Sequence, residues 1–340
     1  MAAHHFARKM EKYFRKGIGL LPANTRTIVK GLVSYIPGVY NFVDDTRSVS
    51  AAFCYSVWLR HLVIASESGL NTDPKVFAEL GPGSSLGVGL SAMLCGTDTH
   101  YALDVIPFPQ RDRNLEILDE LIYLFSKRAS IPHGEDFATE VRPPLSSYGF
   151  PRYILTDERL EQSMAPDRIE SIRTALKRAL SGDTVSEDSG SIEIFYVAPW
   201  NDALVVPADC ADMVLSNTVM QCVEDLQEAY SGCYSWLRAG GYMSHNIDFS
   251  SYGATKEWNG HWACSSLEWR LMRGNRLYLL NRQPHSVHID LMEKTGFKIM
   301  CDLKFMTDSG IKRSELASGF EWISDEDLHT KGAFIQALKP

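Results

Sequence analysis

The sequence predicts an α/β fold in which a doubly wound, seven-stranded, mostly parallel sheet carries helices on both faces. Three observations predict it. The stretch 76–87 is a short apolar run that breaks into glycines and then continues with helical spacing, as at a strand–turn–helix junction. Apolar strand patterns then alternate with helical patterns along the chain. The last apolar run, 332–338, is placed to close the sheet.

The glycine turn of the first junction is suited to a nucleotide-like ligand. Gly81 and Gly83 let the backbone approach a ligand closely, and the N–H groups of the following helix point toward it. Leu86 stands where the dinucleotide fingerprint requires Gly or Ala, which argues against a nicotinamide or flavin site. Glu79, at the end of the strand, is placed to accept hydrogen bonds from a cationic amino-acid ligand.

A second acidic residue follows the next strand pattern. Asp104 ends the run 100–104, where an acid can accept both hydroxyls of a ribose. The alternatives are an ordinary strand-to-helix turn and a helix-capping aspartate. The E-x-G-x-G spacing from Glu79 to Gly83 resembles the first motif of class I S-adenosylmethionine-dependent methyltransferases. The resemblance implies S-adenosylmethionine as cofactor, with S-adenosylhomocysteine as product, bound by Glu79, Gly81, Gly83, Ser85 and Asp104.

A second stretch carries the same resemblance independently of the glycine turn. The fourth and later motifs of these methyltransferases are matched at Asp212, Val214, Ser216, Glu224–Asp225 and 237–241. The resemblance implies a Rossmann-like methyltransferase domain over residues 70–340. Residues 1–69 form an N-terminal helical cap outside it, and an insertion occupies about 106–190.

The chain departs from the family pattern at two places. Gln221–Cys222 replaces the glutamate–histidine pair of many relatives, which excludes a catalytic histidine there. The usual acid after the third strand is also missing. We expect Trp200 to stack on the adenine and Asn201 or Asp202 to meet its amine; a core tryptophan is the alternative. Asn217, at the end of the fourth strand, is a further candidate contact of the cofactor.

Two helical patterns precede the first strand. Residues 1–30 carry basic side chains against the single acid Glu11, with apolar residues at helical spacing. They predict a helix that packs on the catalytic domain or a second subunit, or one that lies on a membrane surface. The pattern at 48–66 predicts a helix across the cofactor end of the sheet. From it, Tyr55 and Arg60 either reach the methionine end of the cofactor or serve as a packing tyrosine and a solvated arginine.

The insertion contains helical patterns at 113–129 and 157–181, a proline-rich joint at 141–145 and a polar run at 181–190. Long insertions in compact domains usually carry function or disorder. The insertion is either a helical lid over the substrate or a decorative or dimer-forming addition.

The rest of the chain alternates strands with helices. Strands are expected at 192–197, 211–217, 242–249, 296–300 and 332–338, and helices at 219–237 and 285–295. The Gly240–Gly241 pair is expected to stop the first of these helices. The last strand is placed to insert antiparallel beside 296–300.

Composition narrows the class of protein. The chain has 340 residues, 45% of them hydrophobic, and a net charge of −8. The acidic balance argues against a general nucleic-acid binder. Seven cysteines without a C-x-x-C pair give neither a disulfide framework nor a zinc signature, and no metal is expected. We expect a cytoplasmic location without stable membrane insertion, because no signal peptide or spanning apolar stretch occurs.

Catalytic residues are expected just after the strands, where open α/β sheets bind their ligands. His245 and His261 lie in a stretch rich in histidine and aromatic residues and are the candidate general bases. Each is otherwise a structural histidine. His285 and His288 are expected to be caps or surface residues.

The sequence therefore predicts a methyltransferase that acts on a small-molecule acceptor, by O-methylation of a hydroxylated metabolite or sugar. N- or C-methylation is an alternative, as is a non-catalytic cofactor-binding or assembly protein with the same fold. A homodimer is possible.

Overall fold

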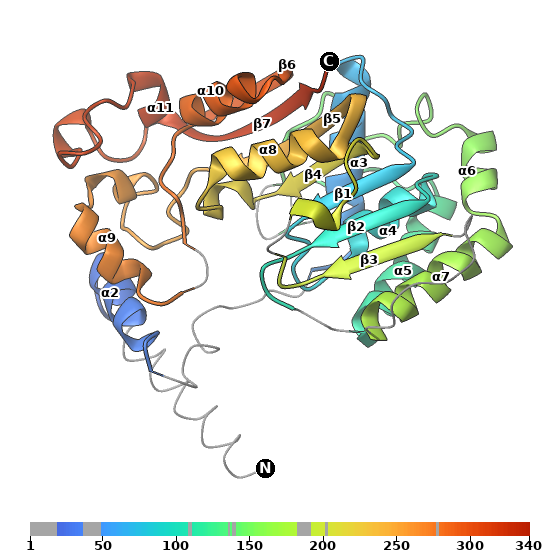
Figure 1. Ribbon diagram of the computed structural model, residues 1–340, viewed down its shortest axis with the longest axis horizontal. Coiled ribbons are helices and arrows are strands. Elements are labelled where there is room, and N and C mark those ends of the chain that lie inside the picture. The colour runs from blue at the N-terminus through green and yellow to red at the C-terminus, as the bar shows by residue number, and fades with distance from the viewer. Residues whose placement is uncertain are drawn as a thin grey trace, which may run out of the picture.

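The computed structural model describes residues 19–36, 49–107, 111–134, 137, 141–181, 192–200, 203–276 and 279–340. Seven strands form one sheet in the order β3-β2-β1-β4-β5-β7-β6 (Figure 1). In chain order they are Val76–Leu80, Thr99–Leu103, Glu193–Val197, Ala211–Asn217, Leu237–Asp248, Lys298–Met306 and Thr330–Leu338. Strands β1 to β5 run parallel, and β7 lies antiparallel between β5 and β6. The predicted fold class is confirmed, including the antiparallel last strand.

One face of the sheet is covered by α3 (Ala51–Glu67), α4 (Gly87–Leu94) and α5 (Arg111–Ser126). Most residues of α3 are buried, and they lie on all faces of the helix. A helix that is apolar all round belongs in the interior of a protein. Helix α3 begins at Ser50, whose hydroxyl accepts a hydrogen bond from the N–H of Phe53. The Trp58 ring of α3 meets the edge of Phe77 of β1, with ring centroids 5.5 Å apart. This helix fixes the position of β1 and of the turn after it.

The other face is covered by α8 (Leu226–Trp236) and α10 (His285–Thr295). The predicted helix 219–237 is shorter in the structure, because the Asp225 carboxylate caps the N–H of Glu228 and starts α8 there. The Gly240–Gly241 pair does not stop this helix. It lies inside β5, where the register with β4 shifts and a Cβ on Gly241 would lie 2.9 Å from the carbonyl oxygen of Ala211.

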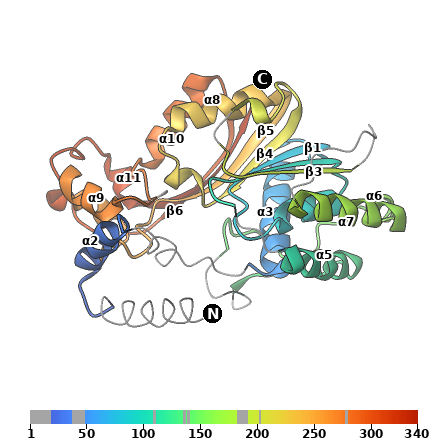
Figure 2. The ribbon, with the colours of Figure 1, turned by 60° about the horizontal axis from the view of Figure 1, so that its bottom comes forward.

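The described helices of the insertion lie against the sheet and its neighbouring helices. They are α5, α6 (Asp157–Ser163) and α7 (Pro166–Ser181), of which α7 packs against β3 (Figure 2). Arg168 of α7 pairs with Asp98 at 2.8 Å and donates to the carbonyl of Thr97. Both partners lie just before β2, at the amino ends of the strands. Arg168 therefore holds α7 at the end of the sheet opposite the glycine turn.

A separate cluster of short helices lies beyond the carboxyl ends of the parallel strands. It contains α2 (Ala23–Val33), the 3₁₀ helix η5 (Gly260–Ala263), α9 (Ser266–Arg273) and α11 (Asp325–His329); we call it the side lobe (Figure 1). Helices α2 and α9 touch backbone to backbone, since a Cβ on Gly31 would lie 2.0 Å from the carbonyl oxygen of Leu271. The remaining short turns are η3 (Ala203–Val205), η4 (Met220–Cys222) and η6 (Arg313–Glu315).

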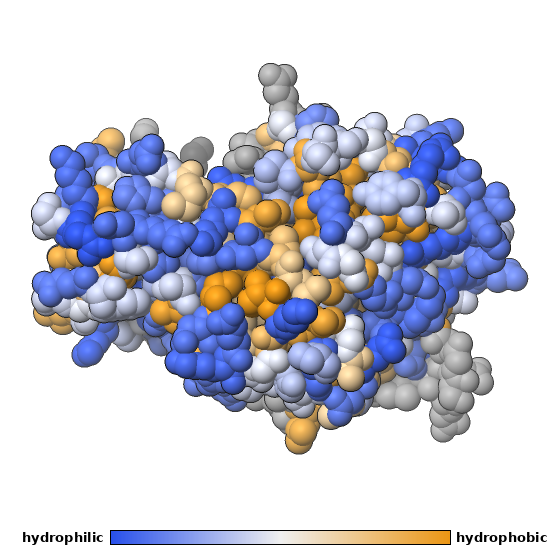
Figure 3. Space-filling view, turned by 90° about the horizontal axis from the view of Figure 1, so that it is seen from above, coloured by the Kyte–Doolittle hydropathy of each residue, from blue (hydrophilic) through white to orange (hydrophobic). Residues whose placement is uncertain are grey.

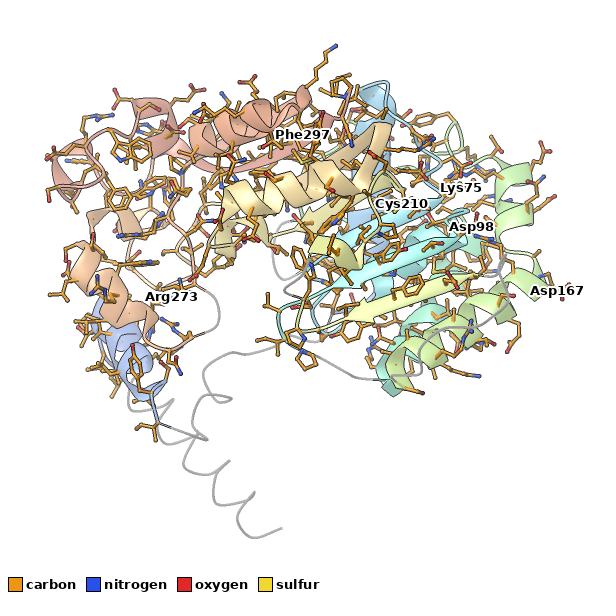
Figure 4. The ribbon with its side chains drawn as sticks, in the orientation of Figure 1. Lys75, Asp98, Asp167, Cys210, Arg273 and Phe297 are labelled. Carbon is orange, nitrogen blue, oxygen red and sulfur yellow. The ribbon has the colours of Figure 1, made fainter. Side chains whose placement is uncertain are left out.

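Three labelled side chains show how the sheet lies relative to this lobe (Figure 4). Figure 4 labels Lys75 and Asp98 near the amino ends of β1 and β2, and Arg273 in the side lobe at the opposite end. Seen from above, the molecule shows hydrophobic areas near its middle among hydrophilic residues (Figure 3). Among the described helices, none is long and apolar enough to cross a bilayer. The first part of the predicted basic helix, residues 1–18, lies outside the described residues.

Candidate functional site

The glycine turn follows β1 at the carboxyl edge of the sheet. Gly81 and Gly83 have φ angles of +66° and +65°, in the left-handed region that favours glycine. A Cβ on Gly81 would also lie 2.5 Å from a methyl carbon of Val219, so this position requires glycine for space as well. A Cβ on Gly83 would meet no atom within 4 Å among the described residues. The backbone at Gly83 is therefore open on the side where a Cβ would stand.

The Asp104 carboxylate lies directly on this turn. Asp104 follows β2, and its Oδ2 accepts a hydrogen bond of 2.8 Å from the Gly83 N–H. Its Oδ1 accepts from the N–H of Val105 at 2.7 Å. Burial raises the pKa of Asp104, and the backbone hydrogen bonds act in the opposite direction. The turn and the acid that the sequence singled out are thus in contact, because β1 and β2 are parallel neighbours.

Glu79 is buried one residue before the end of β1 and faces His100 of β2. Its Oε2 lies 3.2 Å from Nε2 of His100, and neither atom has a hydrogen-bond partner among the described residues. The His100 ring stacks on Phe77 and lies under α4, where Gly89 leaves the space for it. His100 was not predicted. Its register was the available signal, since it pairs with Phe77 and therefore shares a face with Glu79.

Ser85, Trp200 and Asn217 also lie near this edge. The Ser85 hydroxyl accepts from the Gly87 N–H at 3.1 Å, at the start of α4. The backbone N–H of Trp200 donates to the carbonyl of Asp104 at 2.7 Å. The half-buried ring of Trp200 lies edge-on against the ring of Trp236. Asn217 ends β4 and accepts from the side-chain amide of Asn246 at 2.9 Å. Asn201 and Asp202 lie outside the described residues.

Tyr55 and Arg60 point away from the glycine turn, contrary to the expectation that they reach the cofactor. The Tyr55 hydroxyl donates to the carbonyl of Ala129 at 2.6 Å, in the core between α3 and α5. Arg60 is 1% exposed and donates to the carbonyls of Pro132 and Pro143. Both side chains satisfy buried backbone acceptors around the insertion, so the packing alternative holds for Tyr55 and a buried structural role replaces the solvated one for Arg60.

The two candidate bases are buried in the protein interior. His245 lies inside β5 rather than at its end, and its Nδ1 is 2.8 Å from the hydroxyl of Ser216. His261 lies in η5 among the rings of Trp262 and Trp269. Burial lowers the pKa of both histidines to about 3. A general base must reach the acceptor, so their positions contradict the expectation that both face a donor methyl group.

His285 and His288 are also buried, which corrects the expectation of caps or surface residues. His285 Nε2 lies 2.8 Å from the Asp302 carboxylate, and His288 Nδ1 lies 2.6 Å from the Tyr230 hydroxyl. These histidines of the second half of the chain therefore build the interior rather than the site.

Among the described residues, no group of three or more His, Cys, Asp or Glu side chains is arranged to hold a metal ion.

Comparisons with known proteins give structural likeness only. No family model and no curated protein matches the sequence. A putative S-adenosylmethionine-dependent methyltransferase from Listeria monocytogenes matches at a TM-score of 0.39 and 12% identity, over 82% of this chain and 98% of that chain. Phosphoethanolamine N-methyltransferase 2 of Haemonchus contortus, solved with S-adenosyl-L-methionine, matches at 0.42 and 13%, over 90% and 60%. A putative sarcosine dimethylglycine methyltransferase from Galdieria sulphuraria matches at 0.41 and 10%, over 83% and 84%.

The chain is thus similar to methyltransferases, with TM-scores below 0.5 and identities of 10–13% for these three. Such scores carry no argument about activity. The sheet order and the residues at its carboxyl edge carry the functional inference instead.

Proposed function

We propose that this protein is an S-adenosylmethionine-dependent methyltransferase. The observation that carries the proposal is the contact between the Asp104 carboxylate and the Gly81–Gly83 turn. Glu79 is buried near the end of β1, the strand that leads into this turn. A left-handed glycine turn and two acids on adjacent parallel strands suit a ligand that combines a ribose with a cationic amino acid.

The side chains present at the edge fit such a donor. Both carboxylate oxygens of Asp104 accept hydrogen bonds from backbone N–H groups. A carboxylate oxygen can accept more than one hydrogen bond, so ribose hydroxyls could also donate to them. Glu79 has a buried oxygen, Oε2, that no hydrogen bond satisfies among the described residues. An ammonium group of the donor would supply that bond. Trp200 would stack on the adenine, and Asn201, Ser85 and Asn217 remain further proposed contacts.

The donor, when bound, supplies a sulfonium methyl group. The protein's own contribution is to hold donor and acceptor in line and to exclude water from the reacting atoms. We infer a small-molecule acceptor that enters between the carboxyl edge and the side lobe. O-methylation of a hydroxylated metabolite is the proposed reaction, with N- or C-methylation as alternatives. A cytoplasmic location and a homodimer belong to the same proposal.

Binding of S-adenosylhomocysteine tests the proposal. Asp104→Ala removes charge-assisted hydrogen bonds worth about 1.5–3 kcal/mol each, so calorimetry should show a Kd that is roughly ten- to a hundredfold weaker. Asp290→Ala is the matched control, because Asp290 is half-exposed on α10 and pairs with Lys294 in its own helix. Its Kd should equal that of the wild type. Equal affinity in Asp104→Ala and wild type would contradict the assignment of Asp104.

A methyl-transfer assay distinguishes an enzyme from a protein that only binds the cofactor. Labelled S-adenosylmethionine incubated with a small-molecule extract should yield a product heavier by one methyl group. Binding of S-adenosylhomocysteine without any such product would favour the non-catalytic alternative.

A further inference from the structure

A second polar cluster lies at the carboxyl ends of β4 and β5 and takes no part in the donor site. Its members are Gln221 in η4, Asp248 at the end of β5 and Tyr252 in the loop that follows. The Gln221 amide nitrogen donates to the Tyr252 hydroxyl at 2.9 Å. The Tyr252 hydroxyl also lies close to the Asp248 carboxylate, whose charge acts on it. We call this series of side chains the acceptor relay.

The chemistry of the groups sets the direction of these contacts. The Tyr252 hydroxyl accepts from the Gln221 amide, so its own proton is available to Asp248, because a carboxylate only accepts. Burial of the phenol is the main cause that raises the pKa of Tyr252, and the nearby Asp248 charge raises it further. The phenol therefore stays protonated beside the carboxylate. The Ser250 N–H also donates to Asp248 Oδ1 at 2.8 Å.

The acceptor relay lies next to the glycine turn. Val219, two residues before Gln221, is the residue that a Cβ on Gly81 would strike at 2.5 Å. Strands β4 and β5 are parallel neighbours in which Asn217 pairs with Asn246, so Asp248 emerges two residues later at the same edge. The donor site and the acceptor relay are thus adjacent parts of one edge of the sheet.

Two features of the acceptor relay are typical of a binding site. Gln221 is 2% exposed, and its Oε1 has no hydrogen-bond partner among the described residues, which is costly for a buried polar atom. Tyr252 has a φ angle of +49°, a conformation that non-glycine residues rarely adopt and that concentrates at functional sites. Tyr252 is 58% exposed, so much of it remains open to a ligand while its hydroxyl accepts from Gln221.

Helix α2 of the side lobe fixes the loop that carries Tyr252. The Thr27 hydroxyl donates to the carbonyl of Ala254 at 2.8 Å, and Arg26 donates to the carbonyl of Gly253 at 3.1 Å. These carbonyls belong to the two residues after Tyr252. The N-terminal part of the chain therefore contributes to the position of the acceptor relay, although it lies far from it in sequence.

We propose that the acceptor relay binds the acceptor and that Asp248 takes its proton, an inference that rests on the proposed methyltransferase function. The acceptor is a small molecule whose nucleophilic atom carries a proton, in a hydroxyl or an amine. A lone pair of that atom forms a bond to the donor methyl carbon. The carbon–sulfur bond breaks, its electron pair stays on sulfur to give the thioether S-adenosylhomocysteine, and the acceptor proton passes to the Asp248 carboxylate. Tyr252 and Gln221 are positioning residues.

The experiment compares donor binding with turnover in three variants. Asp248→Asn and Tyr252→Phe change the acceptor relay, and Tyr153→Phe is the matched control because Tyr153 is 68% exposed outside it. S-Adenosylhomocysteine binding is measured by calorimetry. Turnover is measured with labelled S-adenosylmethionine and a defined set of a catechol, a simple phenol, a hexose and a primary amine, with the product identified by mass spectrometry. Thermal unfolding verifies that each variant is folded.

We expect Asp248→Asn to bind S-adenosylhomocysteine within about twofold of wild type and to lose roughly a hundred- to ten-thousandfold in kcat. Tyr252→Phe should lower kcat about two- to tenfold without changing the KM for S-adenosylmethionine, because only the polar contact of the phenol with Asp248 is lost. Tyr153→Phe should match wild type in both. The product distinguishes an O-methyl from an N-methyl acceptor.

Different outcomes overturn different claims. Wild-type kcat in folded Asp248→Asn overturns the acceptor relay, and so does the absence of methylated hydroxyls or amines when the wild type binds S-adenosylhomocysteine. A wild-type protein that does not bind S-adenosylhomocysteine overturns the proposed function itself. If Asp248→Asn does not fold, Tyr252→Phe decides, and an unchanged kcat there overturns the inference.

Discussion

At the scale of single residues, Gly89 determines whether the sheet can hold a buried histidine. A Cβ on this residue would lie 1.9 Å from a ring carbon of His100, which sits between α4 and Phe77. Glycine in a helix usually costs about 1 kcal/mol relative to alanine, so this position accepts that cost to make room for the ring. The histidine in turn lies against Glu79, which connects packing under α4 to the proposed donor site.

Gly89→Ala should therefore destabilise the protein, although alanine favours helices. Overpacking of a filled core costs about 1–3 kcal/mol, and urea unfolding should report a loss of that size. Gly319→Ala serves as the control, since a Cβ there would meet no atom within 4 Å among the described residues. A Gly89→Ala protein as stable as wild type would show that His100 does not occupy the space under α4.

At the scale of elements, Arg60 joins helix α3 to the loops of the insertion. It is 1% exposed and donates to the Ser56 hydroxyl as well as to the carbonyls of Pro132 and Pro143. Hydrogen bonds from a charged group are stronger than neutral ones, and their loss leaves buried acceptors unsatisfied. This side chain holds the segment after α5 against α3, away from the glycine turn.

Arg60→Met should destabilise the protein by about 3 kcal/mol or more in urea unfolding, because several hydrogen bonds from a buried guanidinium are lost. Its affinity for S-adenosylhomocysteine should not change. Arg152→Met is the control, because the Arg152 side chain is 62% exposed and its pair with Asp157 is expected to contribute at most about 1 kcal/mol. Weaker cofactor binding in folded Arg60→Met would restore the earlier expectation that Arg60 belongs to the donor site.

At the scale of the whole molecule, buried histidines make stability depend on pH. Burial lowers the pKa of four of them to about 3: His61, His245, His261 and His288. They are neutral in the folded protein but titrate near 6.5 when it is unfolded. The unfolded state therefore binds more protons below pH 6.5, and stability should fall as pH decreases from there toward 3.

Each of these histidines should cost about 2 kcal/mol of stability at pH 5, so their sum approaches the entire stability of a typical domain. We expect the urea midpoint to be constant between about pH 7.5 and 8.5 and to drop steeply between about pH 6.5 and 5. Unfolding followed by circular dichroism across this range measures the effect. An equal midpoint at about pH 7.5 and 5 would show that the histidines accept protons without leaving the folded state.

The sequence by itself determined the order and type of most elements. The strand–turn–helix at 76–87, the acid at 104 and the closing strand at 332–338 depend on local patterns, and all three occur where they were expected. Parallel pairing of β1 with β2 then brings Asp104 to Gly83, because the ends of neighbouring parallel strands meet at one edge. These relations follow from the chain direction and need no knowledge of distant packing.

Only the tertiary structure decided which side chains point to the edge and which are buried. His245 is covered by Tyr230 of α8, and Tyr55 and Arg60 turn toward the insertion, because the groups that cover each residue belong to other elements packed against its own. For the same reason the contacts between Gln221, Tyr252 and Asp248 and their support from Thr27 were not visible in sequence. Burial depends on contacts between segments that local periodicity does not record.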